Sequence, residues 1–427
     1  MRGPWCVISS CAALVGWAAS AAANPLAPEP VRCERGPAMT VWAGAADTPD
    51  VRTRVSAISA AADASGAQLA FTAGVTTQYD SAPWELRLAK VSASAAAAIT
   101  VEQPEDSAAA ETPDPRAVAV TFGDRLGVFS HGLRDLDSFR LVPGGGVVVT
   151  SQLPSALAAA SAGDRVLGAS SGVEGCSSVV TCAELPRGGR RTSVRAHLVR
   201  ARKSRSAVLY QVRDRPGRPA APPGELAVAL AESTAVGGAV AFVAGDALLL
   251  ARTDAQGARR GDVETVTTGR ISRPQAVFRG DHLVLVWVVR EGEIGQGLAG
   301  MELGPGQRPS PTRWVALPTT GRASEPSLRA HGSALWLAWT ETLSAPGASA
   351  ATAASAPLAR VVKLSGTHES LATLTARPLQ ISADAVTASA PALATVASNL
   401  SQGWIAWAEF PQKAHSGGVL AAQLTCR

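Results

Sequence analysis

Apolar residues occur along this chain of 427 residues in short runs of strand length, separated by turns rich in glycine, aspartate and proline. Near the C-terminus one sequence motif occurs three times, over 270–287, 322–339 and 387–407. Each copy contains Ser, any residue and Pro, and ends in an apolar strand that closes with tryptophan. Self-similarity of this kind indicates a fold built from repeated units.

A second repeated element is Gly-Asp followed, after one residue, by Leu or Val. It begins at residues 123, 163, 245 and 280, with looser copies at 66 and 332. Glycine and aspartate adopt the backbone angles of a tight hairpin turn at little cost, so each copy predicts two strands joined by a short turn. A unit of roughly 40–60 residues with about four antiparallel strands is typical of a β-propeller blade.

We therefore predict an all-β fold, a β-propeller, with almost no helix after residue 24. A two-sheet sandwich is the alternative, but it would not repeat one motif so many times. Hairpin turns are predicted near residues 66, 123, 163, 204, 245, 280, 332 and 399, which would allow eight blades. The hairpins near 204 and 245 are each short of a strand, so we interpret them as one irregular blade. The prediction is seven blades, with eight as the alternative.

The last repeat lacks one strand, because the chain ends soon after the strand predicted at 418–424. The segment 37–44, PAMTVWAG, can supply that strand from the other end of the chain. We predict that the N-terminal strand pairs into the final blade and closes the ring.

Residues 1–23 have the pattern of a secretory signal peptide: Arg2, an apolar stretch that begins at Trp5, and three alanines before Asn24. A membrane anchor is the alternative, but the stretch is short for a span. Cys11 has too few apolar residues before it for lipoprotein anchoring. We therefore expect cleavage after residue 23 and an exported, periplasmic or extracellular protein in which 24–427 form one domain. No later apolar run is long enough to span a membrane.

Four cysteines remain after cleavage, and four allow three disulfide pairings. Cys176 and Cys182 are close enough in sequence for a local bridge, which leaves Cys33 and Cys426 at the two ends. An exported protein favours both bridges, and the second would lock the closure of the ring. No C-x-x-C spacing occurs, so we predict no metal site and no cofactor.

The composition changes this picture in one segment only. The chain has 35 Arg against 4 Lys, which we attribute to coding bias. Residues 187–218, however, contain eleven cations and a single acid, Asp214. They predict a patch for a polyanion, formed by Arg190, Arg191, Arg200, Arg202, Lys203 and Arg205. The alternative is that these are solvent-facing strand positions. Nucleic acid is not expected as a partner, because Tyr210 is the only aromatic residue available there for base stacking.

The order Ser-x-Pro, then Gly, then an apolar strand ending in Trp resembles the blades of sialidase-like exported bacterial propellers. The resemblance covers most of the chain after residue 24 and implies the fold alone. The Asp box of that group, Ser-x-Asp-x-Gly-x-Thr-Trp, is absent, and TDAQG at 253–257 is an ordinary turn. Sialidases of the group use an arginine cluster and a tyrosine nucleophile assisted by glutamate. Here Tyr79 and Tyr210 are the only tyrosines, and neither lies in such a motif.

Candidate ligand-binding residues come from the repeats, because no metalloprotease, serine-hydrolase, Walker or EF-hand motif occurs. Glu341 and Glu409 each follow a strand tryptophan by two residues, and Glu291 follows Trp287 by four. We expect these glutamates, with Arg270 and Arg322, to open onto the face that carries the long loops and the Ser-x-Pro connections between blades. The alternative is that the glutamates cap strand ends in water. We interpret the tryptophans as core between blades.

Two functions follow from this reading. The first is a non-catalytic binding or scaffold propeller, a monomer that recognises a glycan, polyanion or protein on its long-loop face. The second is a glycosidase or lyase, which needs paired carboxylates. Two carboxylates and at least two arginines around one pocket at the channel mouth would favour the second.

Overall fold

The strands of this computed structural model assemble into antiparallel sheets that follow one another along the chain. It describes residues 32–426 with internal gaps, the longest of which are 103–116, 175–190 and 344–357. No α-helix occurs among the described residues, so the prediction of an all-β fold is confirmed. The predicted signal peptide and the Cys176–Cys182 bridge lie outside the described residues.

The described strands form seven sheets. The first contains β3 (Val51–Asp63), β4 (Gly66–Thr77), β5 (Glu85–Val91) and β6 (Ile99–Glu102), the second β7 (Ala117–Phe122), β8 (Arg125–His131), β9 (Asp137–Val142) and β10 (Gly146–Thr150), and the third β11 (Pro154–Ala162), β12 (Arg165–Val173), β13 (Arg191–Arg200) and β14 (Lys203–Arg213). The fourth contains β15 (Leu226–Leu230), β16 (Gly238–Ala244), β17 (Ala247–Thr253) and β18 (Arg259–Thr268), and the fifth β19 (Ile271–Arg279), β20 (His282–Glu291), β21 (Gly295–Leu303) and β22 (Val315–Leu317). The sixth contains β23 (Arg322–His331), β24 (Ala334–Thr342), β25 (Leu358–Leu364) and β26 (Leu379–Gln380), and the seventh β27 (Val386–Thr395), β28 (Gln402–Pro411), β29 (Gly418–Cys426), β1 (Cys33–Arg35) and β2 (Met39–Ala43).

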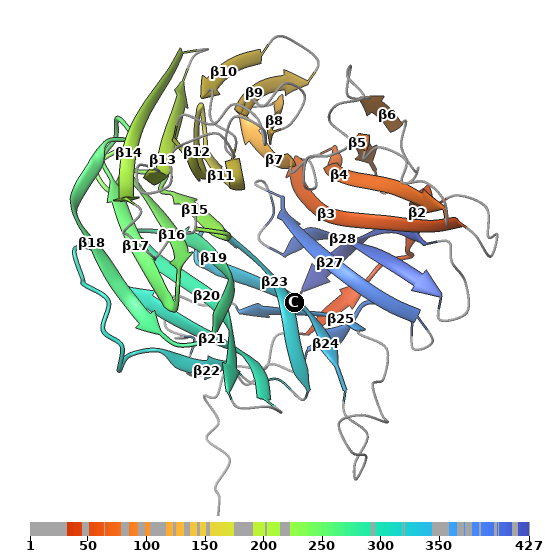
Figure 1. Cartoon of the computed structure of the whole chain (residues 1–427). Coiled ribbons are helices and arrows are strands. Elements are labelled where there is room, and N and C mark those ends of the chain that lie inside the picture. Colours follow the sequence, from red (N-terminus) through yellow and green to blue (C-terminus); the bar gives the residue numbers. More distant parts are fainter. Residues whose placement is uncertain are drawn as a thin grey trace, which may run out of the picture. The chain divides into compact units, whose positions relative to one another are not determined.

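The first strand of each sheet lies at the centre of a ring. β3, β7, β11, β15, β19 and β23 each contact the first strand of the following sheet, and β27 contacts β3. Figure 1 shows the sheets following one another in sequence order around this centre, with β27 next to β3. This cyclic arrangement of antiparallel sheets is a β-propeller.

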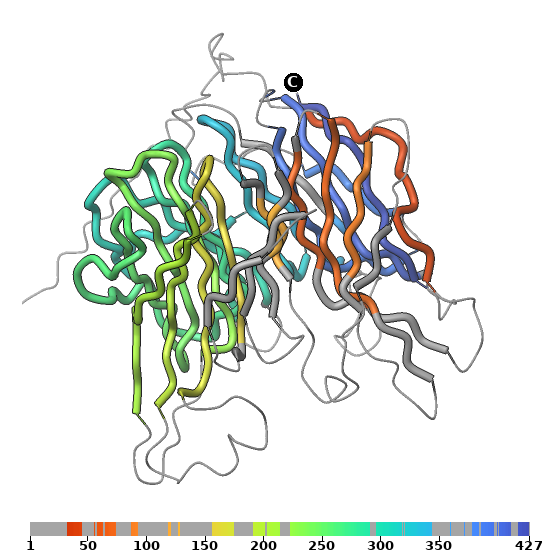
Figure 2. The backbone as a smooth tube through the Cα atoms, turned by 90° about the horizontal axis from the view of Figure 1, so that it is seen from above, coloured from red at the N-terminus to blue at the C-terminus, as the bar shows by residue number. Residues whose placement is uncertain are grey.

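The N-terminal segment completes the seventh sheet, as predicted. β1 and β2 both pair antiparallel with β29, and Cys33 lies opposite Cys426 in the register. The two cysteines form a disulfide across 393 positions of sequence. Figure 2 shows the N-terminal strands, in red, beside the C-terminal strands, in blue. The predicted closing strand and the Cys33–Cys426 bridge are both confirmed.

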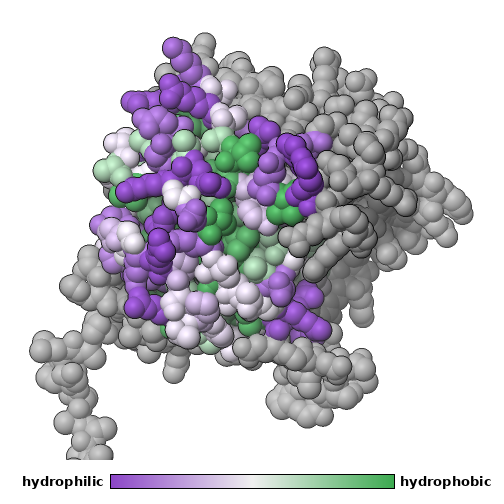
Figure 3. Space-filling view, turned by 60° about the vertical axis from the view of Figure 1, so that its left-hand side comes forward, coloured by the Kyte–Doolittle hydropathy of each residue, from purple (hydrophilic) through white to green (hydrophobic). Residues whose placement is uncertain are grey.

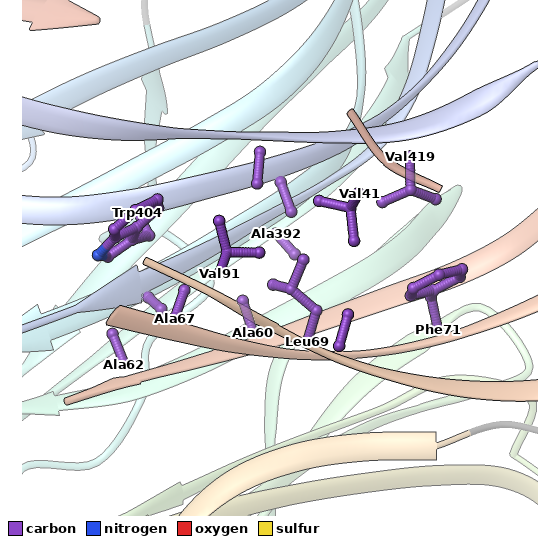
Figure 4. Packing of buried hydrophobic residues seen from close by; sticks show 14 of the residues in the cluster. Val41, Ala60, Ala62, Ala67, Leu69, Phe71, Val91, Ala392, Trp404 and Val419 are labelled. Atoms are coloured by element: carbon purple, nitrogen blue, oxygen red, sulfur yellow. The ribbon is translucent and has the colours of Figure 1, made fainter. Parts of the chain in front are cut away.

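The core consists of separate apolar layers between neighbouring sheets. In Figure 4, Leu69 and Phe71 of the first sheet face Trp404 and Val419 of the seventh. Trp287 occupies the layer between the fourth and fifth sheets and is fully buried. An indole buries a large apolar area, so these layers bind each sheet to the next. The prediction that the tryptophans form core between blades is confirmed.

The tight turns show where the sequence interpretation was correct and where it was not. Gly163, Gly280 and Gly332 have φ of 58°, 63° and 56°, and each turn joins the first and second strands of a sheet. The hairpin near 204 instead joins β13 to β14 in the third sheet, and Gly245 joins β16 to β17 in the fourth. The interpretation of 204 and 245 as one irregular blade was therefore wrong, because their strands belong to two different sheets.

Candidate ligand cavity in the central channel

The three Ser-x-Pro motifs lie inside the innermost strands β19, β23 and β27. Each motif interrupts the pairing with the next strand, as the register shift between Ser324 and Ser327 shows for β23. The middle residues Arg273, Glu325 and Ala390 have φ of 53°, 49° and 48°. Positive φ is uncommon for residues other than glycine, and proline offers no N–H to a strand ladder. The motif is therefore a β-bulge and not a connection between blades, which corrects the sequence interpretation.

These bulges line a cavity of about 310 Å³ at the centre of the ring. Residues from the innermost strands of all seven sheets line it. Its polar lining comes from Ser59, Glu225, Arg273, Gln275, Glu325, Ser327 and Arg329. Backbone strain of this kind persists where the surrounding structure holds it in place, and it is concentrated at functional sites. The cavity is therefore the leading candidate for a ligand site.

The innermost strands run in the same direction. Equivalent positions in these strands therefore lie at the same depth in the central channel. Glu325 Oε2 accepts a hydrogen bond from the Ala390 N–H at 2.7 Å, and Ser327 Oγ accepts one from the Leu393 N–H at 3.1 Å. Both contacts advance toward the C-terminus along β23 and β27 together, so the two strands run parallel. The bulges lie in the first half of their strands. They are therefore close to the face of the ring that also carries the connections between the second and third strands of each sheet.

Two carboxylates of the cavity bind the bulge of the next sheet. Glu225 Oε2 accepts the Arg273 N–H, and Glu325 Oε2 accepts both the Ala390 N–H and the Thr340 hydroxyl, the latter at 2.9 Å. Within the described part of the chain, the Oε1 atoms of both glutamates accept no hydrogen bond. Each side chain thus braces the backbone with one oxygen and keeps the other available.

Two guanidinium groups complete the polar lining. Arg329 Nη1 donates to the Leu328 carbonyl at 2.9 Å, and burial lowers the pKa of Arg329 because desolvation disfavours the charged form. Arg273 is exposed and has no ion-pair partner among the residues that the structure describes. The cavity therefore combines two carboxylates and two arginines, the set that the sequence analysis required for a propeller enzyme.

Two of the glutamates predicted from the sequence, Glu341 and Glu409, do not line this cavity. Glu341 is 0% exposed, and its Oε1 accepts the Gly321 N–H at 3.1 Å. Glu409 is partly buried, and its Oε1 accepts the Ala383 N–H at 3.3 Å. Both carboxylates bind the segment that leads into their sheet. The expectation that Glu341 opens onto the loop face is wrong, because its strand position is enclosed by that segment.

The remaining predicted site residues are spread around the ring. Arg270 and Arg322 are exposed at the starts of β19 and β23 and lie outside the cavity lining. Glu291 ends β20, and its side chain lies outside the described residues. Glu225 and Glu325 were not predicted from the sequence. Glu325 could have been found as the variable position of a Ser-x-Pro motif, whereas Glu225 precedes a strand with no motif around it.

The predicted polyanion patch lies elsewhere, on the outside of the third sheet. Arg191, Arg200, Lys203 and Arg205 are all exposed there. Arg190 and Arg202 lie outside the described residues. In the described part of the chain, no group of three or more His, Cys, Asp or Glu side chains could hold a metal ion. No described helix is long and apolar enough to cross a membrane.

No family model matches the chain, and no curated protein matches it in sequence. Among solved structures, the endosialidase of phage phi92 aligns with 90% of this chain and 69% of its own, with 10% identity and a TM-score of 0.47. A protein of unknown function from Dyadobacter fermentans aligns over 92% and 99%, with 10% identity and a TM-score of 0.47. Trypanosoma rangeli sialidase aligns over 94% and 59%, with 10% identity and a TM-score of 0.42. The resemblance to sialidase-like propellers is one of fold only, and we transfer no residue or activity from these proteins.

Proposed function

We propose that the seven sheets are the blades of an exported, monomeric binding propeller that takes a small polar ligand into its central cavity and does not transform it. The observation that carries the proposal is the strained bulges, which bring Glu225, Arg273, Glu325 and Arg329 to one cavity. Ligand pockets commonly have volumes of about 300–1,000 Å³, so a cavity of about 310 Å³ suits a small ligand.

The chemistry of the lining favours a hydroxyl-rich ligand of the size of a small sugar. The free Oε1 atoms of Glu225 and Glu325 are acceptors for hydroxyl groups. The guanidinium groups of Arg273 and Arg329 are donors to oxygens of the same ligand. A ligand with many hydroxyls can satisfy both kinds of group at once, since each hydroxyl donates and accepts.

Binding is preferred over catalysis because both carboxylates already hold the backbone. A glycosidase needs one carboxyl group as a proton donor and a second as nucleophile or base. Glu225 and Glu325 each accept a backbone N–H of the next sheet, and moving either side chain would release a bulge. The geometry supports fixed acceptors for a bound ligand.

The experiment is a glycan-array screen on the mature protein, followed by calorimetry with the best ligand. We expect Glu325→Gln combined with Arg273→Gln to weaken binding at least tenfold, since each replaces a charged hydrogen bond by a neutral one. The melting temperature should stay within a few degrees, because glutamine retains an acceptor for Ala390. Glu409→Gln is the matched control outside the cavity and should bind normally. Normal binding by the double variant would refute the cavity as the site.

A second candidate function, hydrolysis of a glycosidic bond, is favoured by one observation: two carboxylates and two arginines line the same cavity. Aryl glycosides of several sugars provide a direct assay. Release of the aryl group that is lost in both Glu225→Gln and Glu325→Gln would establish the enzyme and overturn the binding proposal.

A further inference from the structure

The outer edges of the third and fourth sheets carry a cluster of exposed cations. β14 is the outermost strand of the third sheet, with Lys203, Arg205 and Arg213 exposed along it. β18 is the outermost strand of the fourth sheet and begins with exposed Arg259 and Arg260. Figure 3 brings this side of the ring forward and shows hydrophilic side chains, in purple, on either side of apolar patches, in green.

The two edges contact each other, so their cations lie along one continuous edge, on both faces of the strands. Arg259 Nη1 donates to the carbonyl of Leu209 in β14 at 3.3 Å. We call this surface the basic edge, and its members are Lys203, Arg205, Arg213, Arg259 and Arg260. Ten residues of extended strand separate Lys203 from Arg213, a length of about 33 Å at ~3.3 Å per residue.

The acids of the neighbourhood offset the basic edge only in part: Asp262 is exposed in β18, two residues after Arg260, but other nearby acids have different partners. Asp164 pairs with Arg200 at 3.3 Å, and Glu174 pairs with Arg195 at 3.3 Å. Within the described residues, Lys203, Arg205 and Arg260 have no carboxylate within ion-pair distance.

The strand register adds like-charge pairs to this surface. Arg191 lies opposite Arg213, and Arg200, whose charge Asp164 offsets, lies opposite Lys203. Like charges directly opposite each other destabilise a sheet. An anionic partner would remove this repulsion, so the positions of these cations favour a bound polyanion.

We infer that the basic edge binds a linear anionic polysaccharide that lies along β14 and crosses to β18. A membrane surface fits less well, because Val208 is the only exposed large apolar residue among those described and could not anchor the protein in lipid. Nucleic acid fits less well because Tyr210 packs on Phe242 at 5.1 Å between ring centroids and offers no free stacking platform.

The test measures binding of the full-length mature protein to immobilised heparin, a sulfated and carboxylated polysaccharide, over a range of salt concentrations. The variant removes three cations of the basic edge, Lys203→Gln, Arg205→Gln and Arg260→Gln. The control removes three exposed arginines elsewhere, Arg270→Gln, Arg290→Gln and Arg322→Gln. Both lose the same net charge, so they separate a local site from long-range attraction.

We expect the basic-edge variant to bind heparin about tenfold more weakly at physiological salt and with a shallower salt dependence, since fewer counterions are exchanged. The control should bind within about twofold of the wild type. Lys203→Arg with Arg205→Lys keeps the charge and should bind as tightly as the wild type, and an unchanged melting temperature of the basic-edge variant excludes a folding defect. Neutral dextran should not bind.

Two results would overturn the inference. One is equal loss of heparin binding in the basic-edge variant and the control. The other is tight binding to phosphatidylglycerol vesicles with no binding to heparin, which would identify a membrane surface. Neither result bears on the ligand of the central cavity, because the variants leave its lining unchanged.

Discussion

The central channel and the basic edge are both rich in charge, but their charges have different partners. In the channel, Glu225 and Glu325 bind backbone N–H groups of the neighbouring sheet. On the basic edge, Lys203 and Arg205 are exposed, with no carboxylate partner among the described residues. A charge bonded to the backbone is part of the fold, whereas an exposed charge without a partner contributes little to stability and remains available for binding.

The largest effect on stability is expected at the disulfide that links the outer strand β1 to β29. Replacing both Cys33 and Cys426 by serine should lower the free energy of unfolding by ~4–5 kcal/mol, because the bridge closes a very long loop in the unfolded chain. Urea denaturation measures the change. Non-reducing peptide mapping of the wild type is the control, and recovery of Cys33 linked to Cys176 or Cys182 would contradict the pairing.

A smaller effect tests the comparison itself. Glu325→Ala should destabilise the protein by about 2 kcal/mol, because the Ala390 N–H and the Thr340 hydroxyl lose their acceptor. Lys203→Ala should change stability by less than about 0.5 kcal/mol, as is usual for exposed sites. Thermal unfolding of both variants measures the difference. Equal destabilisation would remove the distinction between the two regions.

The smallest effect concerns the strain of the bulges. Ala390 has a φ of 48°, which costs a residue with a Cβ about 1 kcal/mol. Ala390→Gly relieves this cost but adds entropy to the unfolded chain, so stability should stay within about 0.5 kcal/mol of the wild type. Ala330→Gly, in the regular part of β23, should destabilise by about 1 kcal/mol. Chemical denaturation should separate the two, and an equal loss in both would indicate that the bulge is unstrained.

The ring and its closure could be predicted because they depend on local patterns. Glycines such as Gly163 and Gly280 mark turns that any two adjacent strands would need. The missing strand of the last repeat and the pair Cys33 and Cys426 gave two independent indications of the same contact. The apolar neighbours of the indole side chains also predicted the burial of the tryptophans.

The candidate site could be predicted only in part, because it depends on contacts between sheets. Ser-x-Pro consists of residues that are common in turns, so it was taken for a connection. Its bulge is held by a carboxylate from another sheet, as with Glu325 and Ala390, and sequence spacing does not show such a contact. The burial of Glu341 should have been expected from the two-residue period of a strand. That period puts Glu341 on the same strand face as Trp339, which is buried.

The Cys33–Cys426 closure also sets an order of events in time. β1 cannot find its partner until β29 has been synthesised, since the paired cysteines are separated by 393 positions. Contacts so distant in sequence form slowly, and until then the open edge of β29 can pair with other chains. A chain interrupted before β29 would retain most of its sheets but no closed ring. The seam thus makes the synthesis of β29 a condition for the native state.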